Sequence, residues 1–203
     1  MKKEMQRQLV HVAGFLFVVL ALFIGRFVVV YFFLAAAILG MYSIYIKREI
    51  QRLNLLERME RKVRDFILKF EREDVPRPFT GAVWFFFTGG LVFLIFPLTI
   101  ASAAVLMLAI GDGFSTLIGT HFGRHRITEH KTVEGSLTCF IGSLSSIFFL
   151  PISLALLGSL VATIVEIIPD LKPLRGLKNK GWLDDNFLIP ILAGVVVFAA
   201  SAL

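Results

Sequence analysis

Residues 98–118 read LTIASAAVLMLAIGDGFSTLI, a stretch in which Asp112 is the single charged residue. An apolar helix of this length can cross a hydrocarbon core about 30 Å thick. Further apolar stretches predict membrane spans near 9–24, 27–46, 79–96, 133–150, 152–168 and 186–203. The expected fold class is therefore all-α, a polytopic integral membrane helical bundle with about seven transmembrane helices. We expect residues 1–203 to form a single membrane domain.

The composition excludes several classes of protein. Of the 203 residues, 57% are hydrophobic and 18% are charged, whereas soluble domains average about 45–50% and about 25%. The chain has one cysteine, Cys139, so it cannot form an intrachain disulfide. An ordinary soluble enzyme, a disulfide-stapled secreted domain and a disordered chain are all inconsistent with these values.

The positive charges predict how the spans are oriented. Short connections between the predicted spans contain residues typical of tight turns, namely Gly25-Arg26, Pro97 and Pro151. If the spans alternate in direction, the longer segments share one side of the membrane: the N-terminus, 47–78, 119–132 and 169–185. These segments hold 20 of the 21 Lys and Arg residues, and the opposite side holds Arg26 alone. Because basic loops stay in the cytoplasm, the N-terminus is predicted to be cytoplasmic.

Residues 47–74 predict an amphipathic cytoplasmic helix that extends from the second span. Apolar residues recur at three- or four-residue spacing from Ile46 to Phe70. Such a helix is either a solvated connector whose apolar stripe packs locally, a helix lying on the membrane, or one that pairs with a partner helix. A partner helix from a second copy would make the protein a homodimer.

Asp112 is the most informative polar residue. It lies about six residues from the cytoplasmic end of its span, or roughly 9 Å at the helical rise. A carboxylate at that depth costs on the order of 2.5–3.5 kcal/mol, so it should face a cavity, a partner or an ion. Ser115 and Gly119 share its face of the helix. The flanking Gly111 and Gly113 leave room for another backbone or for a ligand.

The region 111–136 is predicted to bind a nucleotide and a metal ion. Glycines and basic residues precede the start of a helix, where amides and the helix dipole favour phosphate. They are Gly119, Gly123, Arg124, Arg126, Lys131 and Thr132. A P-loop motif is absent from the sequence. Taken alone, such a basic loop is also typical of a simple cytoplasmic anchor.

Other polar residues lie at the same predicted level of the membrane. They are Glu4, Arg7 and His11 at the first span, Glu134 and Glu166 at the fifth and sixth, and Asp185 and Asn186 at the last. Acidic groups that could hold Mg²⁺ thus meet basic groups that could hold phosphates. Phosphoryl or nucleotidyl transfer requires this combination, because catalysis there is mostly positioning and charge stabilisation.

These residues occur in motifs that resemble those of the polyprenol kinases. This family includes dolichol, phytol and farnesol kinases and the CTP-dependent diacylglycerol kinase of fungi. The motifs are Glu4-x-x-Arg7-x-x-x-His11, Gly111-Asp112-Gly113, Gly119-x-x-x-Gly123-Arg124, Lys131-Thr132-x-Glu134-Gly135-Ser136, Glu166 and Asp185-Asn186-x-x-Ile189-Pro190. The resemblance runs from Glu4 to Pro190, and the stretch from Asp112 to Ser136 is its most specific part.

The resemblance implies a lipid-alcohol kinase that transfers the terminal phosphate of CTP to a membrane isoprenoid alcohol of dolichol, geranylgeraniol or phytol type. Its partners would be the alcohol, the nucleotide and the bilayer, with Mg²⁺ as cofactor and the active site facing the cytoplasm. We expect catalytic roles for Asp112, Lys131 and Glu134, and metal binding by Asp112, Glu134 and Asp185. Nucleotide would be bound by Gly119, Gly123, Arg124, Lys131, Thr132, Arg7 and His11, supported by Glu4, Glu166 and Asn186.

Other functions remain as alternatives at this point. A CTP-dependent cytidylyltransferase would make a CDP-activated lipid by attack at the α-phosphate, but its C-terminal serine and Lys-Arg signature is absent from the sequence. The D-G-x-x-A-R motif of CDP-alcohol phosphotransferases is also absent, because Asp112-Gly113 is followed by Phe-Ser-Thr-Leu. A small transporter should carry repeats or charges in both halves of the membrane. No nucleic acid partner is expected, because the sequence contains no groove-reading motif.

Overall fold

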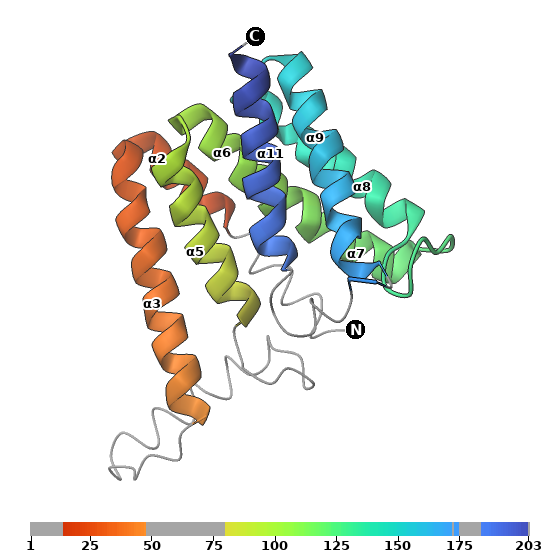
Figure 1. Cartoon of the computed structure of the whole chain (residues 1–203), viewed down its shortest axis with the longest axis horizontal. Helices are drawn as coiled ribbons and strands as arrows, with labels where there is room; N and C mark the ends of the chain where they lie inside the picture. The colour runs from red at the N-terminus through yellow and green to blue at the C-terminus, as the bar shows by residue number, and fades with distance from the viewer. Residues whose placement is uncertain (1–13, 48–79, 172, 175–183, 203) are drawn as a thin grey trace.

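The computed structural model describes residues 14–47, 80–171, 173–174 and 184–202, and over these ranges the chain is helical with no strand. The elements, shown in Figure 1, are α2 (Phe15–Ile24), η1 (Gly25–Phe27), α3 (Val28–Lys47), α5 (Thr80–Ile95), α6 (Leu98–Leu106), η2 (Met107–Asp112), α7 (Gly113–Phe122), α8 (Val133–Ser143), η3 (Leu144–Phe148), α9 (Ile152–Ile167), η4 (Ile168–Asp170) and α11 (Asp185–Ser201). The all-α fold class is thus confirmed for the described residues. The predicted helix 47–74 lies outside these ranges, apart from Lys47, as do Glu4, Arg7 and His11.

The predicted turns are confirmed. Gly25 has a φ of 58°, a left-handed conformation that glycine adopts without a steric penalty, and it separates α2 from α3. Pro97 and Pro151 are the residues before α6 and α9, where the chain reverses. Figure 1 shows that successive long helices run in opposite directions. The loop between α7 and α8 therefore lies at the same end of the bundle as the start of α11.

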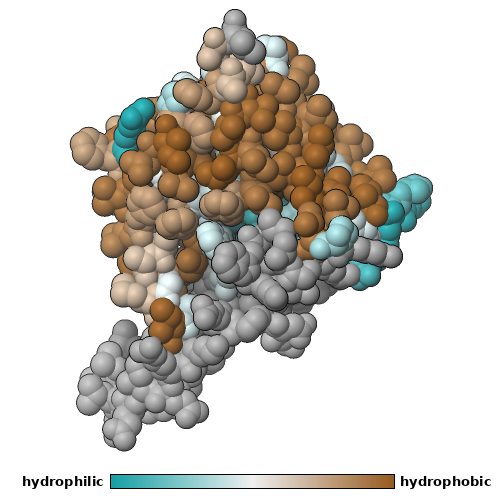
Figure 2. Space-filling view, viewed as in Figure 1, coloured by the Kyte–Doolittle hydropathy of each residue, from teal (hydrophilic) through white to brown (hydrophobic). Residues whose placement is uncertain are grey.

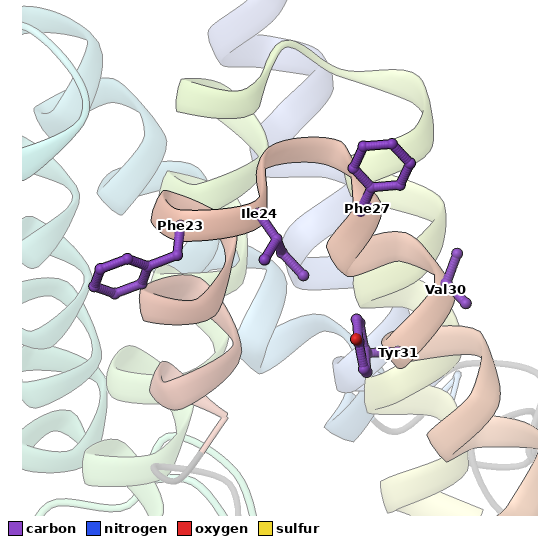
Figure 3. Close-up of a pocket in the computed structure, with 5 residues that line it drawn as sticks. All are labelled: Phe23, Ile24, Phe27, Val30 and Tyr31. Carbon is purple, nitrogen blue, oxygen red and sulfur yellow. The ribbon is translucent and has the colours of Figure 1, made fainter.

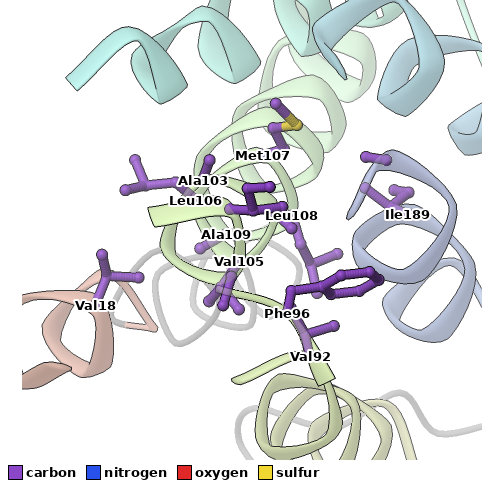
Figure 4. Close-up of a cluster of buried hydrophobic side chains, with 14 of the residues drawn as sticks. Val18, Val92, Phe96, Ala103, Val105, Leu106, Met107, Leu108, Ala109 and Ile189 are labelled. Carbon is purple, nitrogen blue, oxygen red and sulfur yellow. The ribbon is translucent and has the colours of Figure 1, made fainter. Parts of the chain in front are cut away.

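Residues 98–118 form most of the central helix of the bundle. α6, η2 and α7 are continuous, and they pack against α2, α5, α8, α9 and α11. Small buried residues line α6, which allows the surrounding helices to approach closely; they are Ala101, Ser102, Ala103 and Ala104. Figure 4 shows Val18 of α2, Phe96 after α5 and Ile189 of α11 arranged around this helix.

The outer surface of the bundle is apolar. Large side chains such as Phe23 and Phe148 are each 81% exposed, and Figure 2 shows apolar residues over most of the helical surface. Polar residues gather at the edge where the loop between α7 and α8 lies. Continuous exposure of this kind would be unfavourable in water, and it fits a membrane protein.

Three helical stretches are long and apolar enough to cross a membrane: Phe15–Ile44, Leu98–Phe122 and Ile152–Asp170. The first of them contains the turn at Gly25, so it is folded into a hairpin. Thr80–Ile95, Val133–Phe148 and Asp185–Ser201 are shorter apolar helices. The number of spans and the cytoplasmic N-terminus stay predictions.

An apolar hollow lies at the α2–α3 turn (Figure 3). It is lined by Phe23, Ile24, Phe27, Val30 and Tyr31. These side chains offer no carboxylate or ammonium group to a polar ligand. The hollow also lies at the opposite end of the helices from the α7–α8 loop (Figure 1), so it is separate from the polar residues described next.

Candidate active site

Lys131 lies at the centre of a buried cluster of charges. Its Nζ is 2.6 Å from Glu166 Oε1 and 3.7 Å from Asp112 Oδ1. The side chain of Lys131 is 11% exposed, that of Asp112 7% and that of Glu166 0%. The three residues come from the α7–α8 loop, η2 and α9, so the cluster exists only in the folded bundle.

A π-helical turn positions Asp112. Residues Met107–Asp112 form η2, and Asp112 ends this turn in a buried position. A π turn contains more residues than an α-helical turn, so it rotates the side chains that follow relative to those that precede it. Such turns are frequent at functional sites.

Glycines allow η2 and α8 to touch. A Cβ atom on Gly111 would overlap Ser143 Oγ, and one on Gly142 would lie 3.1 Å from the carbonyl oxygen of Ile110. Small residues permit this close helix packing inside membranes. Of the two possibilities at Gly111, a neighbouring backbone or a ligand, the structure shows the close approach of another helix.

The glycines of the predicted phosphate cradle also lie in tight packing. A Cβ on Gly119 would lie 3.1 Å from Thr132 Oγ1 and 3.5 Å from Gly135 Cα. Thr132 caps α8, because its Oγ1 accepts a hydrogen bond from the amide of Gly135 at 3.1 Å. A Cβ on Gly123 would overlap the carbonyl oxygen of Gly119. Gly119 and Gly123 therefore permit close packing, and Thr132 caps the helix.

The loop between α7 and α8 folds back on itself and fixes the backbone of Lys131. The amide of Ile127 donates to the carbonyl of Lys131 at 2.9 Å, and the amide of Val133 donates to that of His125 at 2.8 Å. The amide of Lys131 also donates to Thr128 Oγ1 at 3.0 Å. These bonds determine where the long side chain of Lys131 begins.

Asp170 anchors this loop to the end of α9. Its Oδ2 accepts hydrogen bonds from Thr128 Oγ1 and, at 3.3 Å, from the amide of His130. Sequence reasoning missed Asp170. The signal was its position four residues after Glu166, which places both carboxylates on one face of a helix end.

Glu166 joins three elements through its two oxygens. Ser115 Oγ donates to Oε1 at 2.5 Å, Lys131 Nζ donates to the same oxygen, and Ser136 Oγ lies 3.5 Å from Oε2. A fully buried carboxylate must be paired and hydrogen-bonded to be tolerated. The sequence indicated only a supporting role for Glu166, whereas the structure makes it the common partner of α7, α8 and the loop.

The start of α11 carries two further carboxylates, Asp184 and Asp185, and the charge of Asp185 acts on Lys131. Asp184 caps this helix by accepting a hydrogen bond from the amide of Asn186 at 2.9 Å. Asn186 Nδ2 donates to Asp184 Oδ1 at 2.8 Å and to Asp185 Oδ1 at 3.5 Å. Burial and the adjacent charge of Asp185 raise the pKa of Asp184 to about 7. A cation nearby would relieve this repulsion.

Burial and the neighbouring carboxylates together determine the pKa of Lys131. Burial by itself lowers the pKa, but the charges of Asp112, Glu166 and Asp185 raise it by more, so the net result lies above the ordinary lysine value. Lys131 is therefore a permanent cation. Three carboxylates thus act on one ammonium, a balance of charge that suits a further cation.

Glu134 and Arg124 lie apart from this cluster. Glu134 Oε1 is 2.7 Å from His125 Nδ1, and the amide of His125 donates to both carboxylate oxygens at 3.3 Å. Glu134 thus contacts the loop, and Arg124 is exposed on it. Within the part of the chain that is described, no three His, Cys, Asp or Glu side chains are grouped to hold a metal ion. The oxygen donors of Asp112 and Asp185 nevertheless fit Mg²⁺ chemically.

The chain is similar in sequence to a phytol kinase of Synechocystis sp. The two are 31% identical over 122 residues, which is 57% of this chain and 50% of the phytol kinase. The chain thus spans half the length of this curated relative. No protein-family model matches the chain, and no solved structure matches it significantly. The similarity supports the relationship to polyprenol and phytol kinases that the sequence motifs predict.

Proposed function

We propose that the chain is a membrane-embedded lipid-alcohol kinase that transfers the terminal phosphate of CTP to the hydroxyl of an isoprenoid alcohol. The observation that carries the proposal is the Lys131 ammonium held between Asp112 and Glu166 at the polar end of an apolar bundle. Phosphoryl transfer depends on positioned charge more than on covalent chemistry by the protein. The similarity to a phytol kinase supports the same reaction class.

The reaction forms one bond and breaks one. The alcohol oxygen attacks the terminal phosphorus of CTP, the bond from that phosphorus to the bridging oxygen breaks, and CDP leaves. The hydroxyl proton passes to solvent or to a nearby carboxylate. In this scheme Asp112 would orient the hydroxyl or hold the cation that accompanies the nucleotide.

The charged residues divide the remaining tasks. Lys131 neutralises phosphate as a point charge, while Arg124, exposed on the α7–α8 loop, offers bidentate contacts to phosphate oxygens. Mg²⁺, when bound by Asp112 and Asp185, would neutralise the charge of the phosphates. Asn186 holds the carboxylates at the start of α11 in place.

The apolar exterior suits a lipid substrate. An alcohol dissolved in the bilayer would approach sideways between helices, and the nucleotide would enter from the aqueous side. The positive-inside distribution of Lys and Arg predicts that this side is the cytoplasm. The basic surface there would also attract an anionic nucleotide.

Isotope transfer tests the proposal. The full chain in lipid nanodiscs is incubated with Mg²⁺ and phytol, geranylgeraniol or dolichol, and with CTP labelled at either the γ- or the α-phosphate. A kinase moves only the γ label into the lipid fraction. In a parallel reaction supplied with a lipid phosphate in place of the alcohol, transfer of the α label would instead indicate a cytidylyltransferase. No transfer of either label to any of these acceptors would contradict the kinase proposal.

The nucleotide is tested in the same assay. Parallel reactions with γ-labelled ATP at equal concentration report which nucleotide is used, and we expect a higher kcat/KM with CTP. The matched control protein is the Arg26→Met variant. Arg26 is exposed in η1, at the end of the helices opposite to the α7–α8 loop, so this substitution should leave the transfer rate unchanged.

A further inference from the structure

The Lys131 ammonium occupies the place where a cation would bind the carboxylates of Asp112 and Glu166. It contacts Glu166 at 2.6 Å and lies 3.7 Å from Asp112, and the charge of Asp185 also acts on it. Glu166 is held from its other sides by Ser115 and Ser136. The carboxylates are therefore already arranged around a positive charge, and that charge belongs to the protein itself.

A divalent cation bound by Asp112 would meet the ammonium at short range. Two cations in a buried site repel each other strongly, because little solvent separates them. The side chain of Lys131 is 11% exposed, so water screens this repulsion only weakly. The ammonium and the metal ion therefore compete for the same carboxylates.

Asn186 carries a buried side-chain oxygen at the start of α11. Asn186 is 6% exposed, and its Oδ1 has no hydrogen-bond partner among the described residues. Its Nδ2 faces Asp184 and Asp185, so the side chain belongs to the group of oxygens at the start of α11. An amide oxygen is a ligand of the hard kind that Mg²⁺ and Mn²⁺ accept.

We propose that Lys131 is a place-holding cation that a divalent metal ion displaces from Asp112. Phosphate oxygens of the nucleotide draw the ammonium outward, and the metal ion takes its place among the carboxylates. The inference rests on the proposed function for the identity of that nucleotide. Its consequence is that the metal binds weakly alone and more tightly together with the nucleotide, so the carboxylates never face each other without a cation.

Metal binding without nucleotide or lipid alcohol tests this directly. Mn²⁺ is titrated into the full chain in nanodiscs, and free Mn²⁺ is measured by electron paramagnetic resonance. Removal of the competing charge in Lys131→Met should tighten Mn²⁺ binding by about tenfold or more. The control variant Arg26→Met changes an exposed charge at the opposite end of the helices and should bind Mn²⁺ like the wild type. Unchanged or weaker Mn²⁺ binding by folded Lys131→Met would overturn the proposal.

The wild-type protein gives a second measurement, which does not depend on a variant that folds. Reductive methylation of lysines is followed by mass spectrometry with and without Mn²⁺. Displacement should raise the methylation rate of Lys131 several-fold, while the other lysines serve as internal references. An unchanged rate at saturating Mn²⁺ would overturn the proposal.

The two proposals fail separately. The Mn²⁺ experiments contain neither nucleotide nor lipid alcohol, so their failure would leave the transfer of the γ label untouched. Conversely, an absence of γ transfer would refute the kinase and leave the competition between Lys131 and the metal ion standing.

Discussion

Lys131 Nζ and Glu166 Oε1 lie 2.6 Å apart, although the residues are separated by 35 positions in the sequence. The pair connects the α7–α8 loop to α9 at the polar end of the bundle. Glu166 is fully buried, so its charge depends on this lysine and on two serine hydroxyls. The same lysine lies 3.7 Å from Asp112, which links the stability of the bundle to the chemistry of the site.

The Lys131–Glu166 pair should be strongly coupled in stability. Glu166→Gln or Lys131→Met alone leaves one buried charge with too little compensation, which typically costs about 3–5 kcal/mol. The double variant removes both charges and should recover much of that loss. Denaturant unfolding in detergent micelles measures the three variants as a double-mutant cycle. Strictly additive losses would show that the pair is not coupled.

Asp112→Asn should retain the fold and lose activity. The amide keeps the shape of the side chain but removes the charge that would hold a cation, so the γ-transfer rate should fall by about 10²-fold or more. Higher Mg²⁺ concentrations should recover little of this loss. Glu129→Gln, an exposed change in the nearby loop, serves as the control. A well-folded Asp112→Asn protein with near-normal kcat would show that Asp112 has no role in the transfer reaction.

Asp170→Ala should loosen the α7–α8 loop. Thr128 and the amide of His130 lose their acceptor, so the loop is no longer tied to the end of α9. Amide hydrogen exchange over residues 125–131 should become faster, while exchange in α9 stays slow. The Michaelis constant for the nucleotide should rise severalfold, since Lys131 is presented by this loop. Unchanged exchange in the loop would mean that Asp170 does not anchor it.

Gly111→Ala tests the contact between η2 and α8. The new methyl group would overlap Ser143 Oγ, and overpacking of this kind costs about 1–3 kcal/mol. Gly40→Ala is the matched control, because a Cβ on Gly40 of α3 has no atom within 4 Å. The Tm of Gly111→Ala should fall, and that of Gly40→Ala should stay the same or rise slightly. Adding Ser143→Ala should restore part of the loss at Gly111.

The orientation of the bundle is tested by cysteine labelling of cells. In a Cys139→Ala background, a cysteine at His125 should react only with reagents that reach the cytoplasm. A cysteine at Arg26 should react with a membrane-impermeant reagent added outside. Labelling of both positions from the same side would contradict alternating spans between them.

Helix positions and turns were largely predictable from local sequence. The apolar stretches 27–46, 79–96 and 152–168 coincide with α3, α5 and α9 to within a residue or two, and Gly25, Pro97 and Pro151 lie at the turns as expected. Hydrophobic length and backbone restrictions act locally, so they are legible in a single sequence. The motifs from Asp112 to Ser136 likewise indicated the family to which the comparison with a phytol kinase points.

The partners within the site were not predictable in the same way. The sequence alone determined that a bundle of apolar helices would carry Asp112, Lys131 and Glu166 near one end. Only the tertiary structure decided that Lys131 pairs with Glu166, that Asp170 anchors the loop, and that Glu134 faces His125. The physical reason is the rotation of the helices about their axes. The π turn at Met107–Asp112 and the contact at Gly111 determine which face each helix turns toward the site. A regular helical period read from the sequence predicts neither of these two features.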